Sequence, residues 1–213
     1  MNMKKIYFVR HAECQDEQDE VHMQADSSLS EEGREQAALL AGRFSHTPFN
    51  TLISSPLERS KETAEFIGLA SGKDIVFNNL FDEIKEPTFP EISNKEGVSY
   101  DAVRGIIQEK WHLPAWHYAN EENFTDAKKR AIKALKFLED FPAEKIVVIT
   151  HGHFLTMLFL IMAFGKMVKA DEFTIFDSFS HTDNTGISLC ELKDRKWKMR
   201  RWNDITHVNE KIH

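Results

Sequence analysis

Short apolar runs that alternate with helix-like stretches are the feature that most limits how this chain can fold. Residues 5–9 and 146–149 are short runs that are apolar at most positions, and residues 51–54 are a short run with Leu52 and Ile53 at its centre. Such runs are typical of strands that are buried on both faces of a sheet. After each of them comes a longer stretch whose apolar residues recur at helical spacing. The alternation predicts an α/β fold, a three-layer α/β/α sandwich with a mostly parallel sheet.

Capping residues and glycines place the other elements. We expect a first helix capped by Ser28 or Ser30, and a second helix that starts at Ser55 and Pro56 and ends at Gly72. The remaining predicted elements are a strand over 74–77, helices over 99–110, 126–140 and 154–164, and a late antiparallel hairpin formed by 186–192 and 197–202.

Three prolines interrupt this pattern and mark a small helical cap. Pro87, Pro90 and Pro114 fall within residues 85–125, which we expect to form a cap or lid over the sheet. Because 213 residues is the size of one domain, we expect residues 1–213 to form a single domain that carries this cap. The aromatic run 111–118 either packs the cap or forms a wall that selects the substrate.

Composition excludes several classes of function. The net charge of −7 argues against broad nucleic-acid binding, which requires a basic surface. The longest apolar stretch, residues 154–164, is too short to span a bilayer, so no membrane partner is expected. Two isolated cysteines, Cys14 and Cys190, favour a reducing, cytoplasmic location. Edge strands in the tail would allow a homodimer.

Charged side chains follow three of the predicted strands. Arg10 and His11 come after the first strand, Arg59 after the second, and His151 after the strand at 146–149. Ligands of open α/β sheets bind beyond the carboxyl ends of the strands, so these side chains are expected to converge there. Arginine matches phosphate oxygens in two-point contacts, and imidazole can donate to phosphate or attack it. The cluster therefore predicts a site for a small phosphorylated metabolite.

The motifs around these residues resemble those of one known family. They are VRHAE at 9–13, SSPLERSKETA at 54–64, LFDEI at 80–84, THGHF at 150–154 and DNTGIS at 183–188. In this order they resemble the histidine phosphatase superfamily, in its phosphoglycerate-mutase-like branch. The resemblance runs from residue 5 to about residue 192 and so covers most of the chain.

The resemblance implies a mechanism. His11 would attack phosphorus and form a phosphohistidine, while Arg10, Arg59 and His151 would hold the phosphoryl oxygens. Glu83 would protonate the leaving oxygen and then activate the water that hydrolyses the intermediate. No metal and no cofactor would be needed, because arginine and histidine already supply positive charge.

Three residues depart from the family pattern. Ala12 stands where glycine is usual, Cys14 where threonine is common, and Glu17 where an asparagine often contacts the phosphoryl group. Alanine would be strained if the backbone there were left-handed. Gln15 or Gln18 could take over the phosphoryl contact from residue 17. In the final loop, Asn184 is a further candidate for substrate binding.

Several alternatives stay open. Asp82 and Glu86 compete with Glu83 for the role of acid. His151 and His153 could be read as a metal pair, but no established metal-binding spacing accompanies them. The leading function is a metal-independent phosphatase acting on a small phosphomonoester. The others are a phosphoglycerate mutase and a catalytically silent phosphate-binding or scaffold module.

Overall fold

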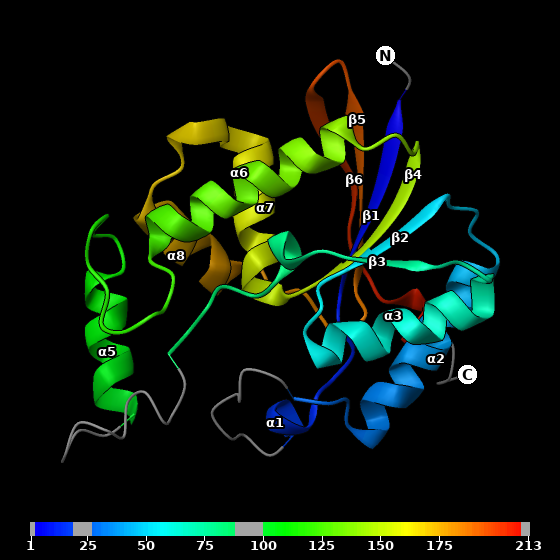
Figure 1. Cartoon of the computed structure of the whole chain (residues 1–213), viewed down its shortest axis with the longest axis horizontal. Helices are drawn as coiled ribbons and strands as arrows, with labels where there is room; N and C mark the ends of the chain where they lie inside the picture. The colour runs from blue at the N-terminus through cyan, green and yellow to red at the C-terminus, as the bar shows by residue number, and fades with distance from the viewer. Residues whose placement is uncertain (1–2, 19–26, 88–99, 210–213) are drawn as a thin grey trace.

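The computed structural model describes residues 3–18, 27–87 and 100–209 (Figure 1). The strands are β1 (Lys4–Arg10), β2 (Thr51–Ser54), β3 (Ile75–Phe77), β4 (Lys145–Thr150), β5 (Ile187–Lys193) and β6 (Lys196–Asp204). The α-helices are α1 (Gln15–Gln18), α2 (Glu31–Ser45), α3 (Glu58–Ser71), α5 (Tyr100–Lys110), α6 (Phe124–Asp140), α7 (Gly152–Phe164), α8 (Ala170–Phe179) and α9 (Thr206–Asn209). Two 3₁₀ turns are η1 (Asn79–Phe81) and η2 (Gly165–Met167).

The strands form one mixed sheet in the order β3-β2-β4-β1-β5-β6. The pairs β3–β2, β2–β4 and β4–β1 are parallel, whereas β5 runs antiparallel to β1 and β6 antiparallel to β5. Arg10 is in register with Thr150, and Ser54 with Ile149. The carboxyl ends of β1, β4 and β2 therefore lie side by side at one edge of the sheet. This arrangement confirms the predicted α/β fold, including its mostly parallel sheet and late antiparallel hairpin.

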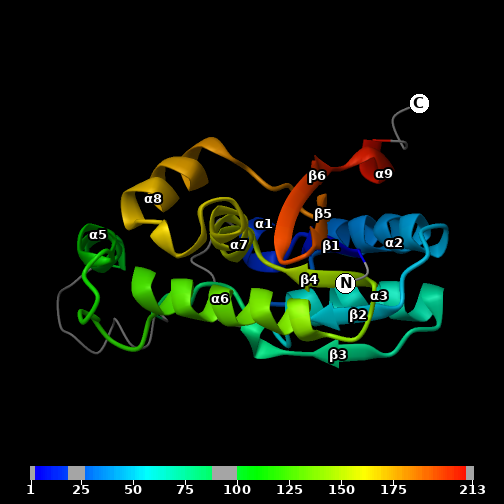
Figure 2. The same cartoon turned by 90° about the horizontal axis from the view of Figure 1, so that it is seen from above.

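Helices cover both faces of the sheet and complete three layers (Figure 2). One face packs against α6 and α7 through Ile6, Phe8 and Val148. The other packs against α2 and α3 through Val9 and Val147. The alternation within β1 arises because successive side chains of a strand point to opposite faces. Both faces of the central strands β1 and β4 are thus largely buried, as their apolar runs predict.

The cap contributes α5, which lies beside α8 and the first turn of α6 (Figures 1 and 2). The Trp111 ring, one residue after α5, lies 5.4 Å from the ring of Phe124 and 4.9 Å from that of Phe173, measured between centroids. Trp111 therefore packs the cap onto α6 and α8, which supports the packing interpretation of the aromatic run. Pro90 and residue 99, the expected start of the cap helix, lie outside the described residues.

Helix boundaries follow the predictions with two differences. Ser30 is the N-cap of α2, as expected, and accepts a 2.9 Å hydrogen bond from Gly33 N. Gly72 ends α3 with φ of 65°, a left-handed conformation that suits glycine. The predicted start of α3 at Ser55 is wrong, because Ser55 N still donates to Ile149 O beyond the β2–β4 ladder. Helices α1, α8 and α9 were not predicted.

Candidate active site

The charged residues that follow the strands meet at the carboxyl edge of the sheet. His11 N donates to Thr150 O at 2.9 Å, which continues the pairing of β1 with β4. The rings of His11 and His151 lie 5.0 Å apart between centroids. Arg59, in the first turn of α3, donates from Nε to His11 Nε2 at 3.2 Å. In the sheet, β4 lies between β1 and β2. The residues that follow these three strands therefore meet, although they are far apart in the sequence.

His11 is held in a form suited to nucleophilic attack. The side chain is buried, and its Nδ1 lies 2.8 Å from Ala12 O. A carbonyl oxygen only accepts hydrogen bonds, so the proton of the neutral ring is on Nδ1. Nε2 then carries the lone pair, in agreement with its position as acceptor of the Arg59 Nε–H bond. This lone pair is what attack on phosphorus requires.

Buried donors of Arg59 and His151 lack partners among the described residues. These atoms are Arg59 Nη1 and His151 Nδ1. Burial costs such groups free energy unless they are hydrogen-bonded, so an unsatisfied pair beside a nucleophile points to a ligand. Burial, together with the positive charge of Arg59, holds the pKa of His151 well below its usual value. His151 is therefore neutral near pH 7, and the approach of an anion would favour its protonation.

Arg10 lies at the same edge and is anchored by the final loop. Its Nη1 donates to Thr182 O at 2.7 Å. Its Nε lies 3.6 Å from the point where a β-carbon on Gly152 would stand. Arg10 is thus next to the first residue of α7, and its guanidinium contributes to the low pKa of His151.

Glu83 reaches the same helix from the segment after η1. Its Oε1 accepts hydrogen bonds from Phe154 N at 2.8 Å and from Ile84 N at 2.9 Å. Its Oε2 accepts from His153 N at 3.2 Å. The carboxylate therefore caps the N-terminus of α7, where His151 is the N-cap residue. Glu83 is thus beside the histidine cluster although β3 and η1 separate it from β2 in the chain.

The two competing carboxyl groups lie in different surroundings. Asp82 accepts a 2.6 Å hydrogen bond from Ser55 Oγ, and burial raises its pKa above the usual value despite that bond. Glu86 is 53% exposed and lies 3.9 Å from Arg104 Nη2. Asp82 therefore stays a serious competitor for the role of acid, whereas Glu86 has the surroundings of a surface carboxylate.

The start of α2 fixes the loop that carries the nucleophile. Glu13 O accepts from Ser30 N, and Glu13 Oε1 accepts from Ser30 Oγ at 2.6 Å. A β-carbon on Gly33 would lie only 1.9 Å from Glu13 O, so only glycine allows this approach. Glu13 thus holds the loop that carries His11. Ala12 is not among the non-glycine residues with positive φ, so the strain considered for it does not arise.

The remaining residues that the sequence singled out near His11 differ in their surroundings. Cys14 is buried and bridges to Leu29 through its backbone, surroundings that are typical of an unreactive structural cysteine. Gln15 begins α1 with an exposed side chain, and its contact with phosphate stays a prediction. Asn184 Nδ2 donates to His11 O at 3.3 Å, so it supports the backbone of His11, and its contact with substrate stays a prediction. The side chains of Glu17 and Gln18 lie outside the described part.

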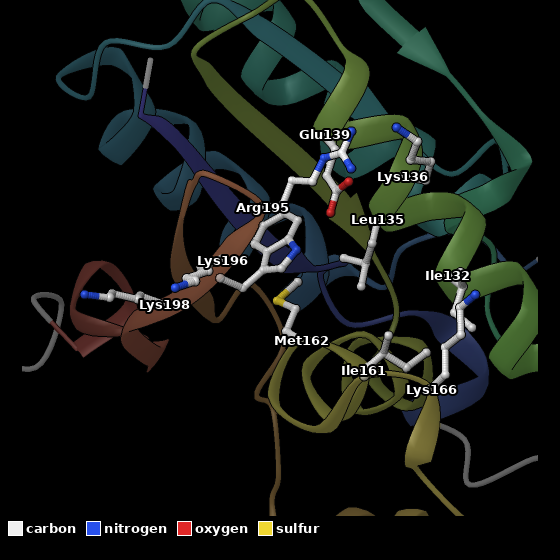
Figure 3. A pocket seen from close by; sticks show the side chains of 12 residues that line it. Ile132, Leu135, Lys136, Glu139, Ile161, Met162, Lys166, Arg195, Lys196 and Lys198 are labelled. Carbon is white, nitrogen blue, oxygen red and sulfur yellow. The ribbon is translucent and has the colours of Figure 1, made fainter. Parts of the chain in front are cut away.

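Other features are separate from this edge. A groove of about 900 Å³ lies between α6, α7 and the β5–β6 hairpin and is lined by Trp197, Met162 and several lysines. Figure 3 shows this groove from close by. The hairpin turn lies beside the start of β1, opposite to His11. In the described ranges, no three His, Cys, Asp or Glu side chains gather as a metal site would require. Every helix in those ranges is too short or too polar to traverse a bilayer.

Comparison with known proteins agrees with this geometry. The sequence profile of the histidine phosphatase superfamily, branch 1, matches residues 6–205. The chain belongs to the histidine phosphatase superfamily. A probable phosphoglycerate mutase, GpmB of Escherichia coli, is 37% identical over 97% of this chain and 96% of the relative.

Two solved structures of other proteins superpose on nearly the whole of this chain. YhfR of Bacillus stearothermophilus superposes with a TM-score of 0.75 at 23% identity, over 96% of this chain and 99% of that one. A phosphoserine phosphatase from Entamoeba histolytica in complex with phosphoserine gives 0.73 at 21%, over 96% and 99%. Both likenesses concern the fold alone.

Two polar residues of this histidine phosphatase superfamily member were not found by sequence reasoning. Ser60, buried next to Arg59, places its Oγ 3.2 Å from His151 Nε2. If the hydroxyl donates, the imidazole proton is on Nδ1, the buried atom that has no partner in the described part of the chain. Arg130 of α6 contacts the segment that carries Glu83. The sequence feature that could have indicated Arg130 is its positive charge beside the apolar stripe of α6, which includes Ala127 and Ala131.

Proposed function

We propose that the protein hydrolyses a small phosphomonoester through a phosphohistidine on His11. His11 Nε2 attacks phosphorus, the bond from phosphorus to the ester oxygen breaks, and the leaving oxygen takes a proton from Glu83. Water then attacks phosphorus, gives its proton to Glu83, and breaks the P–N bond to release inorganic phosphate. Arg10, Arg59 and His151 stabilise the negative charge of both transition states.

One observation carries the proposal. The Nδ1–H of His11 is bonded to Ala12 O, and its Nε2 accepts from Arg59 Nε. Arg59 Nη1 and Nδ1 of the His151 ring, whose centroid lies 5.0 Å from that of His11, are buried and have no partner among the described residues. A nucleophile surrounded by unsatisfied donors suits a phosphoryl group, which offers several acceptor oxygens. A silent scaffold would have no need for the specific tautomer.

Glu83 is proposed as the acid and base on the basis of its position. Its carboxylate shares the N-terminus of α7 with His151, which faces His11. A proton donor at this place can reach an oxygen that leaves from the far side of phosphorus. General acid catalysis of this kind contributes about 10²- to 10⁴-fold to a rate.

Phosphoglycerate mutase activity is the second candidate, because a relative that is 37% identical is named as a probable phosphoglycerate mutase. A mutase must retain its product and exclude water, which requires cations in the lid for the substrate carboxylate. Two described cations of the cap, Arg104 and Lys110, lie next to Glu86 and over the ring of Trp116. These interactions favour hydrolysis. We further propose that the substrate is a small metabolite of the cytoplasm.

Assays in EDTA separate the candidates. The purified chain is incubated with an aryl phosphate, with an alkyl phosphate and with 3-phosphoglycerate, and both inorganic phosphate and 2-phosphoglycerate are measured. We expect phosphate release from the esters and a phosphohistidine that survives an alkaline quench and is lost in acid. Production of 2-phosphoglycerate with little phosphate release would instead establish a mutase. No turnover and no phosphoenzyme would refute both candidates.

A further inference from the structure

Every N–H donor of Arg130, in α6, is hydrogen-bonded to another protein atom. Its Nη1 donates to Asp82 O at 2.6 Å and to Leu80 O at 3.2 Å, and its Nη2 donates to Glu83 O at 3.0 Å. Nη2 and Nε also donate to the two carboxylate oxygens of Glu122. A guanidinium has five N–H groups, and these contacts use all of them. Arg130 therefore has no donor left for a phosphoryl group.

Glu122 extends the same network along the segment that carries Glu83. Its backbone N donates to Lys85 O at 2.9 Å, and its Oε2 accepts from Lys85 N at 3.1 Å. The main chain from 80 to 85 is thus held at several points by Arg130 and Glu122. The side chains of this pair are only 16% and 19% exposed, so their bonds are shielded from competing water.

Arg130 also packs on the residue that holds the carboxylate. Its guanidinium carbon lies 4.1 Å from the centroid of the Phe154 ring. Phe154 N donates the 2.8 Å bond to Glu83 Oε1. The same arginine therefore contacts both the main chain of Glu83 and the helix turn that orients its side chain.

We propose that Arg130, bridged by Glu122, is the positioning residue that fixes Glu83 for proton transfer. The inference rests on the proposed function. A carboxyl group on an irregular segment has no ladder of strand hydrogen bonds to hold it, so its geometry depends on this clamp. Misplacement of a catalytic group by about 1 Å can cost about a hundredfold in rate.

The test compares Arg130→Met with Glu83→Gln on two substrates. On the alkyl phosphate, whose leaving oxygen needs a proton, we expect Arg130→Met to lower kcat about tenfold to a hundredfold. On the aryl phosphate, phosphoenzyme formation should change less than about threefold, because a phenol leaves without help. Arg130→Lys should recover only part of the loss, because lysine lacks the fork that spans several carbonyls. Arg43→Met, which removes an exposed arginine paired at 3.8 Å with Asp204, is the matched control and should leave both rates unchanged.

The double variant Arg130→Met with Glu83→Gln decides whether the arginine acts through the carboxylate. If it does, the double variant is no slower on the alkyl phosphate than Glu83→Gln alone. Losses that multiply, or equal losses of Arg130→Met on both substrates, would overturn the inference. If Arg130→Met does not fold, Glu122→Gln is measured with the same readings and the same criteria.

The outcomes also separate the inference from the proposed function. A wild-type chain without turnover and without phosphoenzyme refutes the proposed function, and the inference falls with it. A wild-type phosphatase in which Glu83→Gln shows the leaving-group effect and Arg130→Met does not refutes the inference alone.

Discussion

The two halves of the site are held in place by different means. In the phosphate half, Arg10, His11 and His151 lie at the ends of β1 and β4, where register dictates position, and Arg59 lies in the first turn of α3, the helix that follows β2. The carboxylate half, residues 80–85 with Glu83, is an irregular segment held by side chains of α6 and its preceding turn. The sheet thus builds the phosphate half, and tertiary contacts build the carboxylate half.

Two arginines show the same difference. Arg59 keeps a buried Nη1 without a partner among the described residues, whereas Arg130 has each donor bonded to protein. An arginine that binds a ligand must keep some N–H groups that are not hydrogen-bonded to protein, whereas an arginine that holds the structure should have all of them hydrogen-bonded. The donors of the two arginines therefore agree with the roles that we propose for them, phosphate binding for Arg59 and positioning of Glu83 for Arg130.

The largest effect is expected at the nucleophile of the phosphate half. His11→Ala removes the attacking nitrogen, so turnover should fall by several orders of magnitude on every phosphomonoester. An alkaline quench after brief exposure to substrate should trap acid-labile phosphate on the wild type and none on the variant. Circular dichroism and thermal unfolding should show that the variant is folded. A rate near that of the wild type would remove His11 from the mechanism.

The next largest effect is expected at Arg59, whose buried Nη1 has no partner among the described residues. Charge-assisted hydrogen bonds contribute about 1.5–3 kcal/mol each, so Arg59→Ala should lower kcat/KM about tenfold to a few thousandfold. Arg59→Lys should recover part of this, because lysine keeps the charge but lacks the planar fork. Steady-state kinetics on aryl and alkyl phosphates should show similar losses. An Arg59 variant that matched the wild type would mean that its Nη1 does not meet the substrate.

The same contrast explains how far the sequence could predict the molecule. Strand runs and helix caps predicted the sheet, and the residues after the strands predicted that Arg10, His11, Arg59 and His151 would converge, because parallel strands end at a common edge. Glu83 was placed by resemblance, since no periodic pattern marks it. Arg130 and Ser60 escaped because their roles depend on contacts between α6 and residues 80–83 and between α3 and His151, which local pattern does not encode.

The carboxylate half should respond to the leaving group. Glu83→Gln should be about a hundredfold slower on an alkyl phosphate, whose alkoxide needs a proton. On an aryl phosphate the phosphohistidine should form at nearly the wild-type rate and then break down slowly, giving a burst of phenol before slow turnover. Rapid-quench kinetics measure both phases.

Two variants serve as comparisons for Glu83→Gln. Asp82→Asn tests the competitor, whose pKa is raised by burial. If Asp82→Asn shows the burst and Glu83→Gln does not, then Asp82 is the acid and Glu83 only caps α7. Glu86→Gln, at an exposed carboxylate, should behave as the wild type on both substrates.

The smallest effect concerns stability, and it should have opposite signs for the two histidines that flank Gly152. In the phosphate half, burial holds the pKa of His151 well below 6.5. The contribution of neutral His151 to the free energy of unfolding is therefore complete above about pH 6.5 and is lost as pH falls. Next to the carboxylate half, a hydrogen bond with Asp177 raises the pKa of His153 to about 9. Its contribution is complete below about pH 6.5 and is lost as pH rises through about 9.

Urea unfolding of the wild type, of His151→Gln and of His153→Gln between about pH 5 and pH 10 separates these contributions. The difference between the wild type and His153→Gln should shrink towards alkaline pH, and only slightly, because the His153 side chain is 53% exposed and water screens its pair with Asp177. The acid-side decline of the wild type should be weaker in His151→Gln, because glutamine does not titrate. Orthovanadate, a phosphate analogue, should reduce that decline in the wild type, since an anion beside His151 favours its charged form. A wild-type acid limb that neither His151→Gln nor orthovanadate alters would show that His151 is not the buried neutral donor of the phosphate half.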